Sequence, residues 1–307
     1  MVEERISRRP VNRKIRLSAS EKTFFMISYT LLILLSIIVL LPLLNVVAQS
    51  LSDPMMVLSG RVVIWPLSPT IKTYVGILKS PSITIGFGNT LIYTVVGTAI
   101  NIVMTVMCAY PLSRKELWGR GVVMFIFTFT MMFGGGMIPT YLMMKTLGLI
   151  DTRWVMVLPG AITVWNMIMA RTFFQSTIPG ELYESASIDG ASDIKVLLSI
   201  VLPLSAPIMA VLTLFYAVAH WNSYFNAMMY LSTPRLFNIQ LVLRNAITNL
   251  RTLMDNEGNL ANLTSSMAAG EAAKYAIIVI AMVPVLIIYP FVQKHFVKGI
   301  MIGSVKG

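Results

Sequence analysis

The sequence predicts an all-α protein whose helices cross a membrane several times. The chain has 307 residues, of which 56% are hydrophobic and only 12% are charged. Its mean hydropathy is +0.75. Soluble domains carry about 25% charged residues, and a spanning helix needs about 20 apolar residues in succession. Because several apolar runs reach that length, we expect a polytopic membrane protein.

Six apolar segments are long enough to be transmembrane helices. Their approximate bounds are 24–48, 87–112, 121–144, 154–174, 202–231 and 274–292. The first is too long for the core of a signal peptide and lacks a small-residue cleavage site, so we interpret it as a retained helix. The third contains Gly134-Gly135-Gly136, which predicts a break or a close helix contact, because glycine weakens a helix.

The remaining segments complete the division of the chain. We expect an N-terminal tail at 1–22, one transmembrane domain at 23–292 and a C-terminal tail at 293–307. Two polar stretches connect helices inside that domain, at 178–203 and at 231–273. We find no soluble domain, internal repeat or low-complexity region.

The positive charges predict the orientation. If the N-terminus is cytoplasmic, the inner segments hold 15 of the 24 lysines and arginines and the longer outer segments hold 9. Since cytoplasmic loops carry the excess of positive charge, both termini and the stretch 178–203 are expected in the cytoplasm, and 231–273 is expected outside. The net charge of +11 is then interpreted as topology-setting charge, so no nucleic-acid partner is expected.

Several chemistries lack the residues that they need. A single cysteine, Cys108, cannot form an intrachain disulfide, and the two histidines, His220 and His295, are predicted on opposite sides of the membrane. We therefore expect no metal site. The phosphate-binding pattern GxxxxGK[ST] does not occur, so ATP is not bound by that route. We find no catalytic set and predict a non-enzymatic protein that binds no cofactor.

The most polar inter-helix stretch is 178–207, which holds four carboxylates and one lysine: Glu181, Glu184, Asp189, Asp193 and Lys195. Pro179-Gly180 ends the preceding helix, and Asp189-Gly190 is a helix-end signal because glycine accepts the left-handed conformation. Two short helices at an angle are predicted, with small residues at the elbow that let another surface approach. From the residues alone, a docking surface and a solvated connector both remain open.

A family resemblance favours the docking surface. The run Glu184-Ser185-Ala186-Ser187-Ile188-Asp189-Gly190-Ala191, followed by Ile200-Val201-Leu202-Pro203, resembles the EAA coupling loop of ABC importer permeases. Its one departure is Ser185 in place of the usual second alanine. The stretches 138–152, Trp221-Asn222 and 289–307 are similar to permeases of the carbohydrate-uptake branch, so the resemblance covers roughly residues 20–307.

The resemblance implies a type I ABC importer transmembrane fold in a bacterial cell membrane, with 178–203 seated in an ATP-binding subunit. Glu184 is expected to meet a basic residue of that subunit, and Gly190 to allow the elbow. The ATPase-coupling residues that it implies are Glu184, Ser185, Ala186, Asp189, Gly190, Ala191, Leu202 and Pro203. The tail 299–307 is expected either to contact the ATPase dimer or to lie near anionic lipid.

The implied partners are a homologous second permease subunit, two ATP-binding subunits, an external substrate-binding (lipo)protein, membrane lipid and a carbohydrate, taken to be an oligosaccharide. ATP and Mg are used by the partner subunits. A non-sugar solute is the alternative cargo. An ion-driven secondary carrier is disfavoured because all 13 acidic residues fall outside the predicted span cores and such carriers use intramembrane acids.

Six polar and aromatic residues of the spans are candidates for the translocation path: Asn101, Trp165, Asn166, Trp221, Asn222 and Asn226. A continuous helix over 202–231 places Asn222 and Asn226 one turn apart on one face. Amides bond sugar hydroxyls, and aromatic rings cover sugar C–H faces. Two alternatives stay open: helix–helix hydrogen bonds for the three residues near mid-membrane, and an interfacial aromatic belt for those at the outer end.

Overall fold

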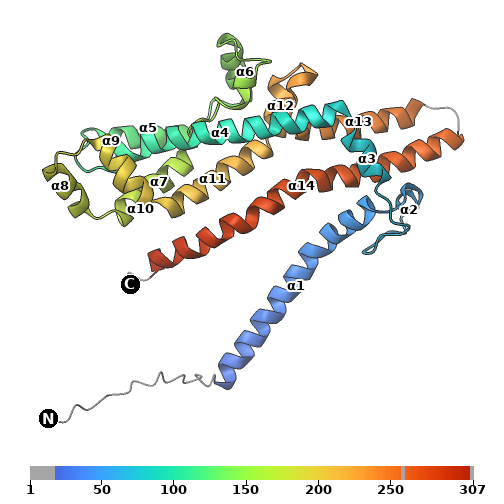
Figure 1. The fold of residues 1–307 in the computed structure, drawn as a ribbon, viewed down its shortest axis with the longest axis horizontal. Helices are drawn as coiled ribbons and strands as arrows, with labels where there is room; N and C mark the ends of the chain where they lie inside the picture. Colours follow the sequence, from blue (N-terminus) through green and yellow to red (C-terminus); the bar gives the residue numbers. More distant parts are fainter. Residues whose placement is uncertain (1–17, 257–259, 305–307) are drawn as a thin grey trace.

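A computed structural model describes residues 18–256 and 260–304, and every regular element in these ranges is helical (Figure 1). The all-α prediction is thereby confirmed. The longer helices are α1 (Ala19–Ser50), α4 (Pro81–Ser113), α5 (Arg120–Met132), α6 (Met137–Thr146), α7 (Val164–Thr177), α11 (Ala206–Trp221), α13 (Ile239–Asn256) and α14 (Leu260–Ser304). The shorter ones are α2 (Pro54–Leu58), α3 (Lys72–Leu78), α8 (Gly180–Ile188), α9 (Asp193–Val196), α10 (Leu202–Leu204) and α12 (Tyr224–Tyr230).

Three described segments are long and apolar enough to cross a membrane: Ala19–Ser50, Pro81–Ser113 and Thr264–Ile287. Two bent pairs qualify if each counts as one span, α5 with α6 at 114° and Asp193–Leu204 with α11 at 84°. The described chain thus offers up to five spans rather than the six expected. The bend in the first pair follows the glycine triplet, where Gly136 has a left-handed φ of 84°.

The predicted span at 154–174 is wrong at its beginning. Residues Arg153–Met156 form one 3₁₀ turn, and the helix α7 starts only at Val164. Its 14 residues extend about 21 Å, which is shorter than the roughly 30 Å hydrocarbon core of a bilayer. Pro159 and Gly160 interrupt this apolar run, and Gly160 has a φ of 75°, so the run could not remain one helix.

The predicted span at 202–231 is also interrupted. The helix α11 ends at Trp221, and α12 begins at Tyr224. The Ser223 hydroxyl donates a hydrogen bond to the His220 carbonyl at 2.7 Å, which is a local bond of the kind that competes with a continuing helix. Asn222 and Asn226 therefore do not lie one turn apart on one helix.

Two segments that we expected to be a loop and a tail are largely helical. The range 231–273 contains α13 and the beginning of α14, and α14 continues to Ser304, within the expected tail. Residues 1–17 of the predicted N-terminal tail lie outside the described residues. The polarity of 239–256 hid an amphipathic helix, whose apolar residues Ile239 and Leu243 pack with Ile83 and Ile277 of neighbouring helices.

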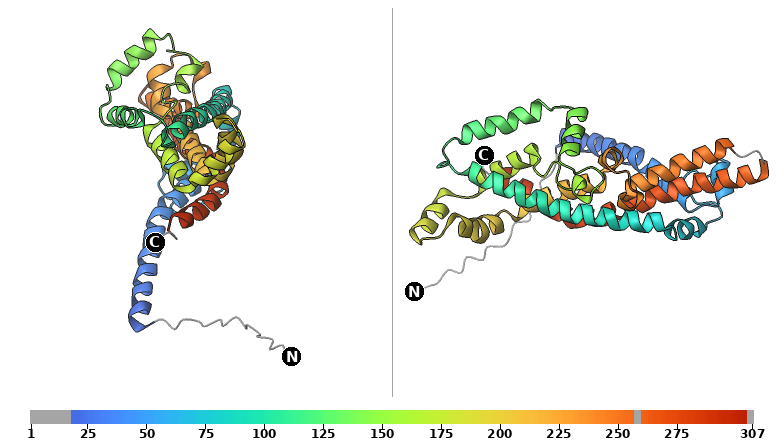
Figure 2. Two further views of the ribbon diagram at one scale, coloured as in Figure 1. Left: turned by 90° about the vertical axis from the view of Figure 1, so that its left-hand side faces the viewer. Right: turned by 90° about the horizontal axis from the view of Figure 1, so that it is seen from above.

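The helix α4 packs against α7, α11 and α13. The helix α14 runs beside α11 and α13, and α1 contacts the bundle through α14 and leans away from it (Figures 1 and 2). The C-terminal end of α14 points toward the same end of the molecule as α8–α10, and α13 extends toward the opposite end (Figure 1). Large apolar side chains cover the exposed surface of α1, as expected for a helix that faces lipid or another subunit.

Candidate functional site

The segment between α7 and α11 forms the two-helix elbow that the sequence predicts. Gly190 has a left-handed φ of 71°. The Ala191 N–H bonds the Ala186 carbonyl at 2.9 Å, and the Gly190 N–H bonds the Ser187 carbonyl at 3.1 Å. These are the two bonds of a Schellman motif, which ends α8 sharply. The hydroxyl of Ser192 accepts a bond from the Lys195 N–H at 3.4 Å and so caps α9.

Beyond α9 the chain bends into the bundle. A π turn at Leu197–Val201 leads to α10, and α11 follows at 84° after Ser205. Pro203 and Pro207 lack the N–H groups that a straight helix would need here, which accounts for the bend. The sequence-predicted residues Leu202 and Pro203 therefore sit on α10, between the elbow and α11.

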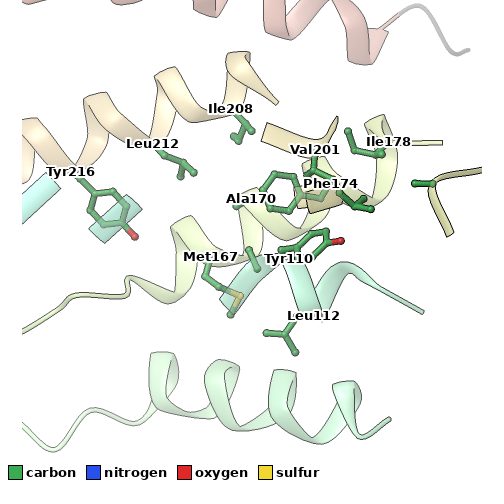
Figure 3. Packing of buried hydrophobic residues seen from close by; sticks show 13 residues of the cluster. Tyr110, Leu112, Met167, Ala170, Phe174, Ile178, Val201, Ile208, Leu212 and Tyr216 are labelled. Carbon is green, nitrogen blue, oxygen red and sulfur yellow. The ribbon is translucent and has the colours of Figure 1, made fainter. Parts of the chain in front are cut away.

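The inner side of the elbow is part of the hydrophobic core. Ala186, Val196 and Val201 are buried, and they belong to one cluster with residues of α4, α7 and α11. Phe174 and Ile178 at the end of α7 lie close to Val201 in this cluster (Figure 3). Since packed interiors resist deformation, a force on the elbow acts directly on three helices of the bundle.

The outer side of the elbow is exposed and combines charge with apolar tips. Glu184, Ser185, Asp189 and Gly190 are all exposed. Ile188 is 87% exposed and Ile194 is 70% exposed, although both are large apolar side chains. Exposed apolar residues rimmed by polar ones are typical of a protein–protein contact. This surface, residues 184–194, is called the elbow surface below.

A cavity of about 680 Å³ opens beside the elbow surface. Glu184, Tyr183 and Ser187 form its α8 wall, and Arg114, Lys115, Glu116 and Arg120, from the connection between α4 and α5, face them. Arg114 pairs with Glu116 at 3.2 Å, and its guanidinium lies 3.9 Å from the centroid of the Tyr183 ring. A cation over an aromatic face is attractive, so Arg114 ties α8 to the end of α4.

Two ionisable groups beside Arg114 have shifted pKa values, Tyr183 and Glu116. Burial raises the pKa of the Tyr183 hydroxyl, against the opposing effect of the Arg114 charge. A hydrogen bond from its own backbone N–H, with help from Arg114, lowers the pKa of the Glu116 carboxyl. Tyr183 therefore stays neutral and Glu116 stays ionised near pH 7. The sequence analysis did not name Arg114 or Tyr183 as site residues. The short basic run at 113–120 was the signal that could have identified Arg114.

The translocation candidates divide between helix contacts and exposed positions. Asn101 is buried, donates to the carbonyls of Gly160 and Ala161 at 2.9 and 3.0 Å, and contacts the His220 ring nitrogen at 2.6 Å. Trp221 is buried, and its indole N–H donates to the Ala281 carbonyl at 3.0 Å. Both side chains thus join helices in this structure. For Asn101 this is the helix–helix hydrogen bond that the sequence analysis left open as an alternative to a role in the path.

The other four candidates lie apart from one another. Asn166 is buried in α7, whereas its neighbour Trp165 is 57% exposed. Asn222 lines a cavity at the end of α11 that is remote from the elbow, and Asn226 is exposed on α12. The structure therefore does not gather the six into one site, and their role in a path stays a prediction. Gln240 and Arg244 line the same cavity as Asn222, and we missed them because 231–273 was taken for a loop.

Comparison with known proteins gives consistent matches along the chain. The model of the family "Binding-protein-dependent transport system inner membrane component" matches residues 101–302. The polygalacturonan/rhamnogalacturonan transport system permease protein YtcP of Bacillus subtilis is 40% identical over 287 residues, covering 93% of this chain and 99% of the relative. Protein LplC of Bacillus subtilis is 42% identical over 270 residues, covering 88% and 90%.

A solved structure also matches the fold. One chain of a bacterial ABC transporter involved in the import of the acidic polysaccharide alginate superposes with a TM-score of 0.82 at 34% identity. The match covers 91% of this chain and 99% of that chain. The similarity therefore extends over nearly the whole length of both proteins.

Proposed function

The chain belongs to the binding-protein-dependent transport system inner-membrane components, and from that premise we propose that it is the permease subunit through which an ATP-driven importer moves an oligosaccharide. The observation that carries the proposal is the elbow, whose outer face is exposed and whose inner face is part of the hydrophobic core. The two relatives and the solved structure described above include proteins named for polysaccharide import. We expect this chain to take a cargo of the same broad class.

We propose that the elbow surface couples transport to ATP. An ATP-binding subunit would contact Ile188 and Ile194 through an apolar groove and Glu184 through a basic side chain. When two such subunits close around ATP, they would draw the elbows of two permease subunits together. Because Ala186, Val196 and Val201 join the elbow to α4, α7 and α11, that movement would reorient the bundle and change the side to which the path opens.

The proposed complex contains a homologous second permease, two ATP-binding subunits and an external binding protein. The exposed face of α1, with apolar residues such as Leu31 and Ile38, supports burial against lipid or a second subunit. ATP and Mg would be used by the partners, and this chain contributes no residue to that chemistry. Within this scheme the 178–203 stretch is cytoplasmic and the 231–273 region is external.

The substitution Glu184→Lys tests the coupling role. Reversing the charge places a cation against the basic partner, so we expect oligosaccharide uptake to fall by more than about tenfold. Uptake of labelled oligosaccharide into vesicles that contain the whole complex measures the effect. Glu181→Lys is the matched control, because Glu181 is exposed on the same helix but does not line the cavity beside Arg114.

Co-purification of the ATP-binding subunits with the Glu184→Lys variant completes the test. Docking at Glu184 is supported if the variant complex assembles but no longer takes up oligosaccharide. It is also supported if the variant inserts but no longer co-purifies with the ATP-binding subunits. Uptake equal to wild type by the assembled variant would overturn the coupling role. A complex that moves no carbohydrate, while its binding protein is stabilised by another solute, would overturn the proposed cargo.

A further inference from the structure

A second cavity lies at the end of α11 that is remote from the elbow. Its volume of about 560 Å³ is within the range of small-molecule sites, about 300–1,000 Å³. The break between α11 and α12 forms one wall, α13 forms another, and the apolar face of α14 around Ile277, Ala281 and Val285 forms the third. The 16 residues of α11 place this cavity about 24 Å from the 84° bend.

Four polar side chains reach this cavity from two elements. Gln240 and Arg244 are four residues apart on α13 and therefore lie on one face. Asn222 and Tyr224 come from the helix break. The Asn222 amide N–H₂ donates to the Val218 carbonyl at 3.0 Å, which leaves its oxygen to accept from a ligand. The helix break and the α13 register together place these four groups on the wall of one cavity.

The charge in this cavity is unbalanced. Arg244 is exposed, and it forms no ion pair with any residue whose side chain the structure describes. Its guanidinium lies 5.7 Å from the centroid of the Tyr224 ring, near the limit of a cation–π contact. None of the residues that line the cavity is acidic. A guanidinium held against apolar walls favours an anion, and its planar fork matches a carboxylate.

We propose that Arg244 selects cargo that carries carboxylates, so that the oligosaccharide moved by this permease contains uronic acids. The guanidinium of Arg244 binds a sugar carboxylate, the Tyr224 ring covers a sugar C–H face, and the amides of Asn222 and Gln240 bond hydroxyls. This inference rests on the proposed function and adds the chemical class of its cargo. A lipid phosphate could also pair with Arg244, but the amides that line the same cavity suit a ligand with hydroxyls beside its acid group.

The test compares two cargoes in the complete complex, reconstituted in vesicles with its own binding protein. One probe is a labelled oligogalacturonate, and the other is the same oligosaccharide after reduction of its carboxylates to alcohols. For Arg244→Gln we expect uptake of the acidic probe to fall at least about tenfold at subsaturating concentration, because a charge-assisted pair is lost. Arg244→Lys keeps the charge but not the fork, so we expect an intermediate rate.

The matched control is Arg235→Gln. Arg235 is exposed on the same outer region but does not line the cavity, so uptake of the acidic probe should equal that of wild type. Stimulation of ATP hydrolysis by the loaded binding protein reports assembly, and for Arg244→Gln we expect it to persist.

Three results would overturn the inference. The wild-type complex could transport only the neutral probe, or Arg244→Gln could take up the acidic probe as fast as wild type. Alternatively, Arg244→Gln could regain uptake of the acidic probe in vesicles without anionic lipid, which would show that Arg244 pairs with a lipid phosphate. The first of these leaves the proposed function standing. Absence of any carbohydrate transport by the wild-type complex would instead remove the proposed function itself.

Discussion

At the scale of single residues, Gly190 and Arg114 fix the elbow surface in different ways. Gly190 supplies the left-handed φ of 71° that ends α8, and Arg114 holds Tyr183 on the other side of that helix. The exposed position of Glu184 is therefore set by backbone geometry at one end and by a cation–π contact beside it.

Substitution of Gly190 by alanine isolates the backbone contribution. A Cβ at this position would meet no atom within 4 Å, so the cost is conformational and amounts to about 1–2 kcal/mol. We expect hydrogen exchange of the Ala191 amide, which closes the Schellman motif, to accelerate by roughly tenfold. Gly180→Ala is the control, since Gly180 also has open space but lies at the first position of a helix. Equal exchange in both variants would contradict this account.

At the scale of elements, α13 is held against α4 by hydrogen bonds rather than by apolar contacts alone. The hydroxyl of Thr90 accepts a bond from the Ile239 N–H at 2.7 Å, and Asn89 donates to the carbonyls of Arg235 and Phe237 at 2.8 and 3.0 Å. A Cβ on Gly86 would lie only 3.3 Å from the Ile239 Cα. The start of α13, and with it the cavity that Arg244 lines, is positioned by α4.

Thr90→Val tests this attachment. The variant keeps the shape of the side chain but leaves the buried Ile239 N–H without an acceptor, which costs about 1–3 kcal/mol. We expect a lower denaturant midpoint for unfolding of the purified chain in detergent micelles. Thr84→Val is the matched control on the same helix, because the Thr84 hydroxyl is exposed and bonds only its own helix at 3.5 Å. A midpoint for Thr90→Val as high as that of the control would show that apolar packing alone holds α13.

At the scale of the whole molecule, the proposed mechanism needs a rigid connection from the elbow to the helices that line the path. The core cluster that contains Phe174, Val201, Leu212 and Tyr216 provides it (Figure 3). Its members come from α4, α7, α11 and the elbow, so the proposed motion at one end of α11 would be carried toward the cavity at its other end.

Phe174→Ala should weaken that connection. Phe174 is 1% exposed, and removal of a buried phenylalanine costs about 3–5 kcal/mol and leaves a void. We expect ATP hydrolysis by the assembled complex to continue while the number of cargo molecules imported per ATP falls. Parallel assays of uptake and hydrolysis measure that ratio. Phe125→Ala, at a position 68% exposed, should leave the ratio unchanged, and an unchanged ratio in both variants would place the connection elsewhere.

The sequence determined the membrane class, the elbow and its ends. These follow from local signals: apolar runs long enough to span a bilayer, and the Pro179-Gly180 and Asp189-Gly190 stops. Each acts over a few residues, so no tertiary contact was needed to predict it. The coupling residues were instead implied by the family resemblance, and their role remains a prediction.

Only the tertiary structure decided whether the more polar segments are helices and which side chains meet. The helix α13 depends on its packing against α4 and α14, so its polar sequence looked like a loop. Asn101 and Trp221 bond to partners more than 50 residues away, and Arg244 meets Tyr224 only because the chain breaks at Asn222. Local patterns carry no information about such distant pairs, because the bundle packing alone brings them together.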